Sequence, residues 1–171
     1  ICKLTGISRL DLQLSNLDDS DVPYFNKLTR LSSLSLSLTE VTGKGLANFQ
    51  HLKNLHMLSF NYNNGIHELI EALAGSENIE DLSIDSPDKP IEAADLQRLA
   101  KLKNLNFLSV QNSGIDDKSL EILYGMPRLA TLNINECTVS NAAIEKSKKS
   151  YGGKKIEVIS TQTQLLKSKG G

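Results

Sequence analysis

The sequence predicts an α/β solenoid, that is, a stack of similar strand–turn–helix coils. Apolar residues with the spacing L-x-x-L-x-L recur about every 24 residues, and repetition at such a period is typical of solenoids. Each copy alternates apolar and polar residues and is followed by apolar residues at helical spacing. The six copies begin at Ile7, Leu31, Leu55, Ile79, Leu105 and Leu129, which are position 1 of their coils.

The first six residues of each coil predict a short β-strand. Apolar residues at positions 4 and 6, such as Leu34 and Leu36, alternate with polar ones. Successive side chains of a strand point to opposite faces, so the apolar ones should face the interior and positions 3, 5 and 7 should face solvent. Because every coil repeats this pattern, the strands should lie side by side in one parallel sheet.

The second half of each coil predicts a turn and a helix. A further apolar residue near position 11 is followed by a polar residue suited to capping a helix. These candidate caps are Asp18, Thr42, Asp116 and Ser140. Apolar residues at positions 16, 19 and 22, such as Val22, Phe25 and Leu28 in the first coil, then complete the coil. The third coil should carry a longer regular helix at about residues 67–74.

Two segments, 31–52 (LSSLSLSLTEVTGKGLANFQHL) and 129–144 (LATLNINECTVSNAAI), resemble the leucine-rich-repeat family, most closely its cysteine-containing subtype. The resemblance implies a right-handed, curved stack with a parallel sheet on the concave face and helices on the convex face. For function it implies macromolecular recognition, with no shared catalytic residues. The subtype carries Cys or Asn at position 9, which here reads Ser15, Thr39, Asn63, Pro87, Ser113 and Cys137.

We expect one repeat domain over residues 1–159 and a polar, basic tail or linker over residues 160–171. Ile1 and Leu4 match the last helical positions of a preceding coil, so we expect a piece of a longer repeat protein or a trimmed N-terminus. Residues 154–159 should form a closing strand. The fourth coil is longer and places S-P-D-K-P at 86–90, which predicts a bulge at the rim, either a partner-contact loop or a tolerated insertion.

Charge and cysteine content limit the classes of function. Residues 1–141 carry 12 Lys and Arg against 18 Asp and Glu, net −6, whereas residues 142–171 carry 7 Lys against 2 Glu, net +5. An acidic body without aromatic stacking platforms argues against nucleic-acid binding, and the basic tail is interpreted as a solvated terminus. Cys2 and Cys137 do not form a disulfide framework. The sequence shows no membrane span and no signal segment, so localisation stays open, and the free cysteines favour an intracellular compartment. We expect a soluble, monomeric protein.

No residue pattern predicts catalysis, a cofactor or a metal site. The three histidines lack metal-ligand spacing with one another or with a cysteine. Cys137 has no histidine near it in the repeat register to act as a base. The acidic segment 18–21 carries oxygen ligands that suit a cation, but acidic residues also favour a helix N-terminus. We interpret the acidic segment 18–21 as a helix N-terminus. Taken together, these patterns predict that the protein is not an enzyme.

The predicted contact surface is the polar side of the strands in the third to fifth coils. Small hydroxyl and amide side chains would form a groove, and Met57, Tyr62 and Phe107 would anchor a partner. The whole set is Met57, Ser59, Asn61, Tyr62, Ser83, Asp85, Phe107, Ser109 and Gln111. We therefore expect a protein-recognition module whose protein partner binds the concave strand face. Two alternatives stay open: an architectural spacer without a ligand and, by family analogy, the substrate-recognition part of a ubiquitin-ligase-type adaptor.

Overall fold

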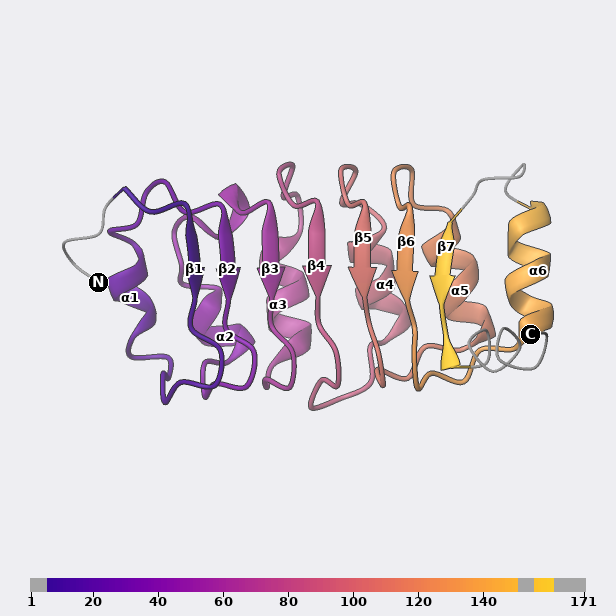
Figure 1. Cartoon of the computed structure of the whole chain (residues 1–171), viewed down its shortest axis with the longest axis horizontal. Helices are drawn as coiled ribbons and strands as arrows, with labels where there is room; N and C mark the ends of the chain where they lie inside the picture. Colours follow the sequence, from indigo (N-terminus) through magenta and orange to yellow (C-terminus); the bar gives the residue numbers. More distant parts are fainter. Residues whose placement is uncertain (1–5, 151–155, 162–171) are drawn as a thin grey trace, which may run out of the picture.

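A seven-stranded parallel sheet runs the length of the molecule (Figure 1). The computed structural model describes residues 6–150 and 156–161. The strands lie side by side in sequence order, so each coil adds one strand beside the one before it. They are β1 (Arg9–Asp11), β2 (Ser33–Ser35), β3 (Met57–Ser59), β4 (Asp81–Ser83), β5 (Phe107–Ser109), β6 (Thr131–Asn133) and β7 (Glu157–Ile159).

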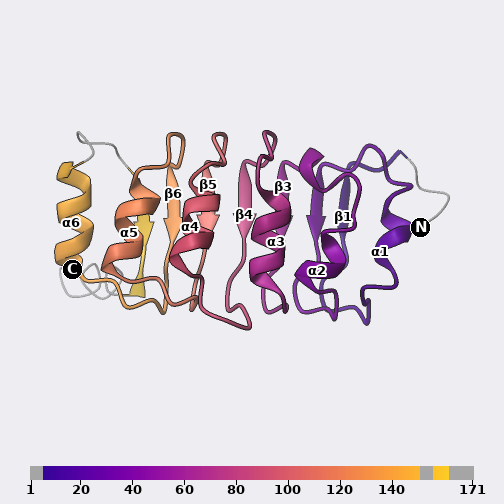
Figure 2. The same cartoon turned by 180° about the vertical axis from the view of Figure 1, so that it is seen from behind.

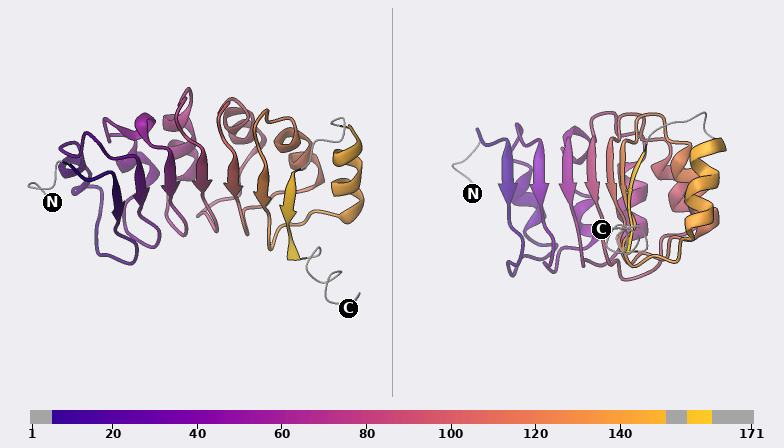
Figure 3. Two further views of the ribbon diagram at one scale, coloured as in Figure 1. Left: turned by 45° about the horizontal axis from the view of Figure 1, so that its top comes forward. Right: turned by 45° about the vertical axis from the view of Figure 1, so that its right-hand side comes forward.

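Helices form a second layer behind the sheet (Figure 2). Those of the described residues are α1 (Val22–Phe25), α2 (Gly43–Leu46), the short 3-10 helix η1 (Leu52–Asn54), α3 (Ile66–Leu73), α4 (Ala93–Leu99), α5 (Asp117–Tyr124) and α6 (Asn141–Ser150). The stack bends gently so that the sheet lies on its inner side (Figure 3). The fold is therefore the predicted α/β solenoid, with the sheet on the concave face and the helices on the convex face.

The strand register explains how the repeat builds its core. Leu10 pairs with Leu34, and Leu34 with Leu58, so position 4 forms one continuous row along the stack. Leu82 pairs with Leu108, 26 residues later, so the longer fourth coil keeps the row intact. The additional length is taken up at 86–90, in the connection between β4 and α4.

Side chains of the strands and helices meet in one hydrophobic core. The predicted helix positions are buried throughout: Val22, Phe25 and Leu28 are 0% exposed. The rings of Phe25 and Phe49 meet edge to face at 6.4 Å between centroids and join the first two coils. Each coil therefore buries its apolar side chains against its neighbours, as expected when the repeating unit cannot bury them alone.

Three of the four predicted helix caps are confirmed. Thr42 accepts a hydrogen bond from the Gly45 amide at 3.0 Å, Asp116 caps α5, and Ser140 caps α6. The prediction for Asp18 is wrong, because α1 begins only at Val22 and its N-cap residue is Asp21. The Asp18 carboxylate instead accepts hydrogen bonds from the amide and hydroxyl of Ser20, so it stabilises the turn before the helix.

Some acidic side chains fasten one coil to the next. Asp19 accepts hydrogen bonds from the amide and the hydroxyl of Thr42, at 2.7 and 2.8 Å. Asp117 makes the same pair of contacts with Ser140, at the same distances. Each carboxylate thus holds the residue that caps the helix of the next coil. Asp19, one of the acids considered for a cation, is engaged in this structural contact.

The second and third coils approach most closely where glycines meet. A Cβ atom at Gly43 would lie 1.7 Å from the carbonyl oxygen of Gly65, and the Gly43 amide donates to the Asn64 carbonyl at 2.8 Å. Gly65 has φ of +81°, a left-handed conformation that glycine adopts without steric cost. It precedes α3, which is an eight-residue helix, so the expected longer helix of the third coil is confirmed.

Except for Pro87, the position 9 side chains donate hydrogen bonds to backbone carbonyl groups. The hydroxyl of Thr39 donates to the Leu36 carbonyl at 2.8 Å, and Asn63 donates to the Val41 carbonyl at 2.9 Å. Cys137 is a free thiol that donates to the Val110 carbonyl at 3.2 Å. It is half-buried and packs against the hydrophobic core.

Several expectations concern residues outside the described ranges. Ile1, Cys2 and Leu4 lie there, as do Lys154, Lys155 and residues 162–171. The described part of the expected closing strand is β7, which pairs with β6 through Leu132 and Val158. Within the described residues, no helix combines the length and the apolar character needed to cross a membrane.

Candidate partner-binding surface

The sheet face presents two outward rows of side chains, one at each end of the short strands. Position 3 forms one row, because Met57 pairs with Asp81, and Asp81 with Phe107. Position 5 forms the other, in which Ser59, Ser83 and Ser109 are in register. The predicted contact residues at positions 3 and 5 are therefore brought together on one face. Whether they bind a partner stays a prediction.

Polar side chains at positions 5 and 7 bond to one another from coil to coil. The Ser37 hydroxyl lies 2.8 Å from the Ser59 hydroxyl and accepts a hydrogen bond from the Asn61 amide at 3.0 Å. The side-chain carbonyl of Asn61 accepts hydrogen bonds from the Ser83 hydroxyl and the Asp85 amide, at 2.9 and 2.7 Å. We call this chain of bonds the polar ladder.

Asp85 continues the polar ladder into the fifth coil. Its carboxylate accepts hydrogen bonds from the Ser109 hydroxyl at 2.6 Å and from the Gln111 amide at 2.8 Å. The Gln111 side-chain amide donates to the second carboxylate oxygen at 2.9 Å. In three successive coils, then, the side chain at position 7 satisfies the position-7 amide of the next coil, a group that otherwise would lose its hydrogen bond on burial.

The polar ladder leaves little of its members for a partner. Asp85 is 8% exposed and Ser109 is 2% exposed, although both were predicted contact residues. Their hydroxyl and carboxylate groups are bonded within the chain, which is how buried polar groups are normally stabilised. These two side chains therefore present little surface to solvent.

An open hollow lies over strands β3 to β6. Its volume is about 540 Å³, and its lining is formed by Met57, Asp81, Asn106, Phe107 and Thr131 together with inner-strand residues. Met57 is 39% exposed, and Phe107 is half-buried. The hollow thus combines two of the predicted apolar anchors with an acidic side chain that lies between them in the row.

Asp81 is the unusual member of the hollow. Within the described part of the chain, its half-buried carboxylate has no hydrogen-bond or ion-pair partner. Desolvation by burial raises the pKa of Asp81 above its usual value of 3.8, and the neighbouring Glu80 carboxylate raises it further. Such a carboxylate is uncompensated in the free protein, and a cation placed beside it would be favoured.

A second apolar surface lies at the rim, where the chain leaves the strands. Leu14, Leu38 and Tyr62 occupy position 8 of three consecutive coils and are 73%, 46% and 60% exposed. Their amides donate to the next coil at 2.9 to 3.0 Å, so the three residues are neighbours. We call them the rim stripe.

The rim stripe carries backbone strain. All three residues have φ near +60°, a left-handed conformation that costs an L-amino acid about 1–2 kcal/mol. The fifth coil has Asn112 at the same position, a residue type that tolerates this conformation. Leucine and tyrosine are therefore less suited to the backbone conformation of position 8 than asparagine, and their side chains are largely exposed.

Leu14 and Leu38 were missing from the predicted contact surface. In the sequence they extend the apolar alternation of Leu12 and Leu36, which favours an inward direction for a continuing strand. The left-handed turn at position 8 ends the strand and turns these side chains outward. The available signal was the polar residue at the same position in later coils, namely Ser86, Asn112 and Glu136.

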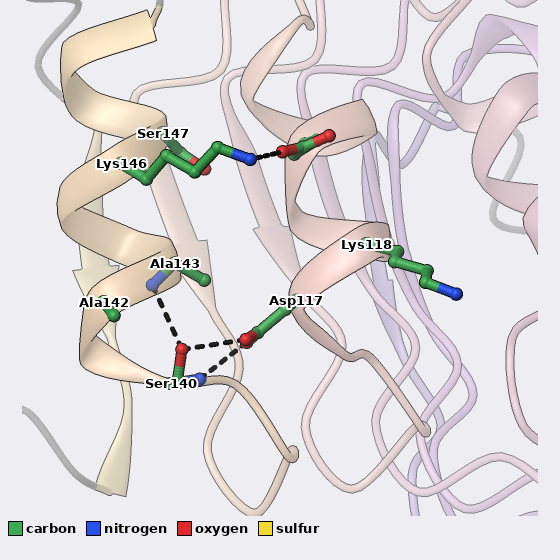
Figure 4. Close-up of a pocket in the computed structure, with 8 residues that line it drawn as sticks. Asp117, Lys118, Ser140, Ala142, Ala143, Lys146 and Ser147 are labelled. Carbon is green, nitrogen blue, oxygen red and sulfur yellow. Dashed lines mark hydrogen bonds and ion pairs between the residues drawn. The ribbon is translucent and has the colours of Figure 1, made fainter.

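The helix face has a smaller hollow, of about 320 Å³, between α5 and α6 (Figure 4). Asp117 and Ser140 form its floor through the capping contacts described above. Lys146 bonds to Glu121 at 2.6 Å across it. The charged side chains of this hollow hold two helices together, which gives it a structural role.

Two of the histidines, His51 and His67, make structural contacts. His67 lies 2.6 Å from the Asp95 carboxylate, which Arg98 approaches at 3.5 Å, and His51 contacts the Asn26 carbonyl at 3.2 Å. No group of three or more His, Cys, Asp or Glu side chains in the described ranges is arranged to hold a metal ion. Asp95 also accepts a hydrogen bond from the Glu92 amide at the start of α4, so it serves as part of a helix cap.

The repeat, the parallel sheet and the single helix layer define a leucine-rich-repeat solenoid. Sequence comparison gives no matching family model and no matching curated relative. Solved structures with this fold include two internalins of Listeria monocytogenes, which are leucine-rich-repeat proteins. The first (inlF) is 18% identical with a TM-score of 0.52, and the match covers 94% of this chain and 55% of the internalin chain. The second, internalin C2 (inlC2), is 18% identical with a TM-score of 0.58, and the match covers 92% of this chain and 82% of the internalin chain.

The chain thus spans about half the length of the first of these internalins. At such low identity the likeness shows the fold and does not transfer a binding partner. The leucine-rich-repeat resemblance of the sequence is supported, whereas the cysteine-containing subtype is not confirmed. At position 9, Ser15 and Thr39 donate to the position-6 carbonyl of their own coil, whereas Cys137 donates to the position-6 carbonyl of the preceding coil.

Proposed function

We propose that this chain is a protein-recognition module that binds a protein partner through its concave sheet face and the adjoining rim. The observation that carries the proposal is the rim stripe: three exposed apolar side chains on consecutive coils, each held in a strained conformation. Exposed apolar side chains that gather in one place are typical of interaction sites. The likeness to internalins, which share the leucine-rich-repeat fold, supports an interaction module of this kind.

The shape of the surface favours a macromolecule over a small ligand. Seven strands at a spacing of about 4.8 Å give a face roughly 30 Å long. Its hollow is open to solvent and covers β3 to β6, whereas the rim stripe follows the ends of β1 to β3. A partner that covers both surfaces would therefore extend across the sheet, as peptides and protein loops do.

The architectural alternative has one observation in its favour, which is the polar ladder. Because Asn61 and Asp85 satisfy backbone amides, much of the polar character of this face serves the fold itself. A spacer, however, has no use for Leu14 and Leu38 at left-handed positions. The rim stripe therefore favours binding.

A capture experiment with matched variants tests the proposal. The chain is used as bait beside a sheet variant, Met57→Lys with Leu38→Lys, and a helix-face variant, Tyr24→Lys. Tyr24 is 52% exposed on α1, so it controls for the loss of an exposed apolar side chain. Circular dichroism establishes that all three baits are folded.

We expect one protein to bind the unchanged chain and the Tyr24→Lys variant, and to be lost by the sheet variant. Equal retention by all three baits would place the site elsewhere and contradict the proposal. If no protein is retained by any bait, in lysate and in secreted material of the source organism, the architectural interpretation is favoured instead.

A further inference from the structure

The row Met57–Asp81–Phe107 in the hollow has a specific chemistry. The three residues occupy position 3 of adjacent strands, so their side chains follow one another at a spacing of about 4.8 Å. A thioether and an aromatic ring therefore flank a single carboxylate. The carboxylates of Asp85 and Asp117 are bonded within the chain, whereas that of Asp81 is not.

No cation of the described chain compensates Asp81. Arg9 lies in the same position-3 row, but three strands away, at roughly 14 Å by strand spacing. At that distance exposed charges are largely screened at physiological salt. The adjacent charge is Glu80, which has the same sign. The hollow is thus a negative site with apolar walls.

Resting on the proposed function, we infer that the hollow binds an arginine or lysine side chain of the partner. The aliphatic stem would pack against Met57 and Phe107, and the cationic end group would pair with Asp81. Long basic side chains commonly bury their stems on apolar surface while the charge finds a polar partner. The Phe107 ring adds attraction for a cation near its face.

Other ligand classes fit less well. An anion would be repelled by Asp81 and Glu80, and a purely apolar side chain would leave the carboxylate desolvated without a partner. A metal ion needs several oxygen or nitrogen ligands, and the lining provides one carboxylate. A basic side chain uses both the charge and the apolar walls.

The inference is tested with two peptides that differ only in charge. The first is acetyl-Ala-Leu-Arg-Leu-Ala-amide, and the second has citrulline, the uncharged isostere, in place of arginine. Each is titrated into isotopically labelled chain while the amide chemical shifts are followed by NMR. We expect the arginine peptide to shift the amides of Met57, Asp81 and Phe107, and to bind about five-fold more tightly than the citrulline peptide, as expected for one partly solvated ion pair.

Two variants complete the test. Asp81→Asn should bind both peptides equally and weakly, while Asp116→Asn, which removes an exposed carboxylate on the helix side, should keep the preference for arginine. Equal binding of the two peptides by the unchanged chain would overturn the inference, as would arginine-dependent shifts that lie away from the hollow. A protein captured through the sheet face and unaffected by Asp81→Asn would also reject it, while leaving the proposed function intact.

Discussion

The side-chain carbonyl of Asn61 accepts a hydrogen bond at 2.7 Å from the backbone amide of Asp85, 24 residues further along the chain. Asp85 repeats the arrangement by accepting from the amide of Gln111. A side chain of one coil thus completes the backbone hydrogen bonding of the next, on the side of the sheet opposite to the leucine core. The repeat is held together by polar as well as apolar contacts, and this gives the first prediction.

Asp85→Ala should destabilise the fold by about 1–3 kcal/mol, because it leaves the Gln111 amide and the Ser109 hydroxyl without their acceptor. The free energy of unfolding in urea measures the loss. Asp11→Ala serves as the control, since Asp11 is exposed and bonds only locally to Gln13, and it should change stability by less than about 0.5 kcal/mol. Equal effects of the two changes would show that the polar ladder contributes nothing.

Leu82→Ala should cost about 2–5 kcal/mol, because it opens a cavity in the row of inward leucines. Leu82 is 0% exposed and pairs in register with Leu58 and Leu108. The neighbouring outward residue gives a matched control, and Met57→Ala should stay within about 0.5 kcal/mol of the unchanged chain. A small effect at Leu82, measured by urea unfolding, would mean that the register is wrong.

Gly43→Ala should be strongly destabilising for so small a change. The added methyl group would collide with the carbonyl oxygen of Gly65, and the two coils would have to move apart at a cost of about 1–3 kcal/mol. Gly6→Ala is the control, because a Cβ atom there meets nothing within 4 Å. Thermal unfolding of the two variants should differ by several degrees, and similar midpoints would refute the close approach.

Leu38→Asn should stabilise the fold by about 0.5–1 kcal/mol, since asparagine tolerates the left-handed conformation better than leucine. The reverse change in the fifth coil, Asn112→Leu, should destabilise by a similar amount. Under the proposed function, Leu38→Asn should also weaken partner capture. A variant that is less stable than the unchanged chain would contradict the strain argument.

Two aspartates should change the pH dependence of stability in opposite directions. Burial raises the pKa of Asp81 in the folded state. Its contribution to the free energy of unfolding is therefore fully present below pH 3.8 and is lost as the pH rises through the pKa of the folded state. Hydrogen bonds from Ser119 lower the pKa of Asp116 in the folded state. Its contribution to the free energy of unfolding is therefore present above pH 3.8 and is lost as the pH falls through the pKa of the folded state.

Asp81→Asn should therefore gain stability relative to the unchanged chain between pH 3 and pH 7, whereas Asp116→Asn should lose it over the same range. Urea unfolding at both pH values gives the comparison for each variant. If Asp81→Asn instead loses stability toward neutral pH, then an unrecognised cation neutralises this carboxylate.

The regular part of this fold was predictable because its information is local and repeated. The alternation at Leu34 and Leu36 defines a strand wherever it occurs, and the six copies fix the register. The caps at Thr42, Asp116 and Ser140 followed from the residue types that bond to free helix amides. Asp18 failed as a cap because the first coil inserts a turn before its helix, a choice that the local sequence does not determine.

The candidate site was only partly predictable. The rows of outward residues followed from strand alternation, but the burial of Asp85 and Ser109 depends on hydrogen bonds between coils. The exposure of Leu38 depends on the sign of one backbone angle. Such features arise from contacts between residues that lie 24 or more positions apart in the sequence. They therefore cannot be read from a single repeat.

Because each coil packs mainly against its two neighbours, the solenoid should respond to mechanical force in a characteristic way. In the part of the chain that the structure describes, the principal contacts between elements join each coil to the one before and the one after it. A steady pull along the stack axis would detach coils one after another, each releasing roughly 80 Å of extended chain. The molecule would then behave as a series of breakable links, and the coils joined through Gly43 and Gly65 would yield separately from those joined through Asp85.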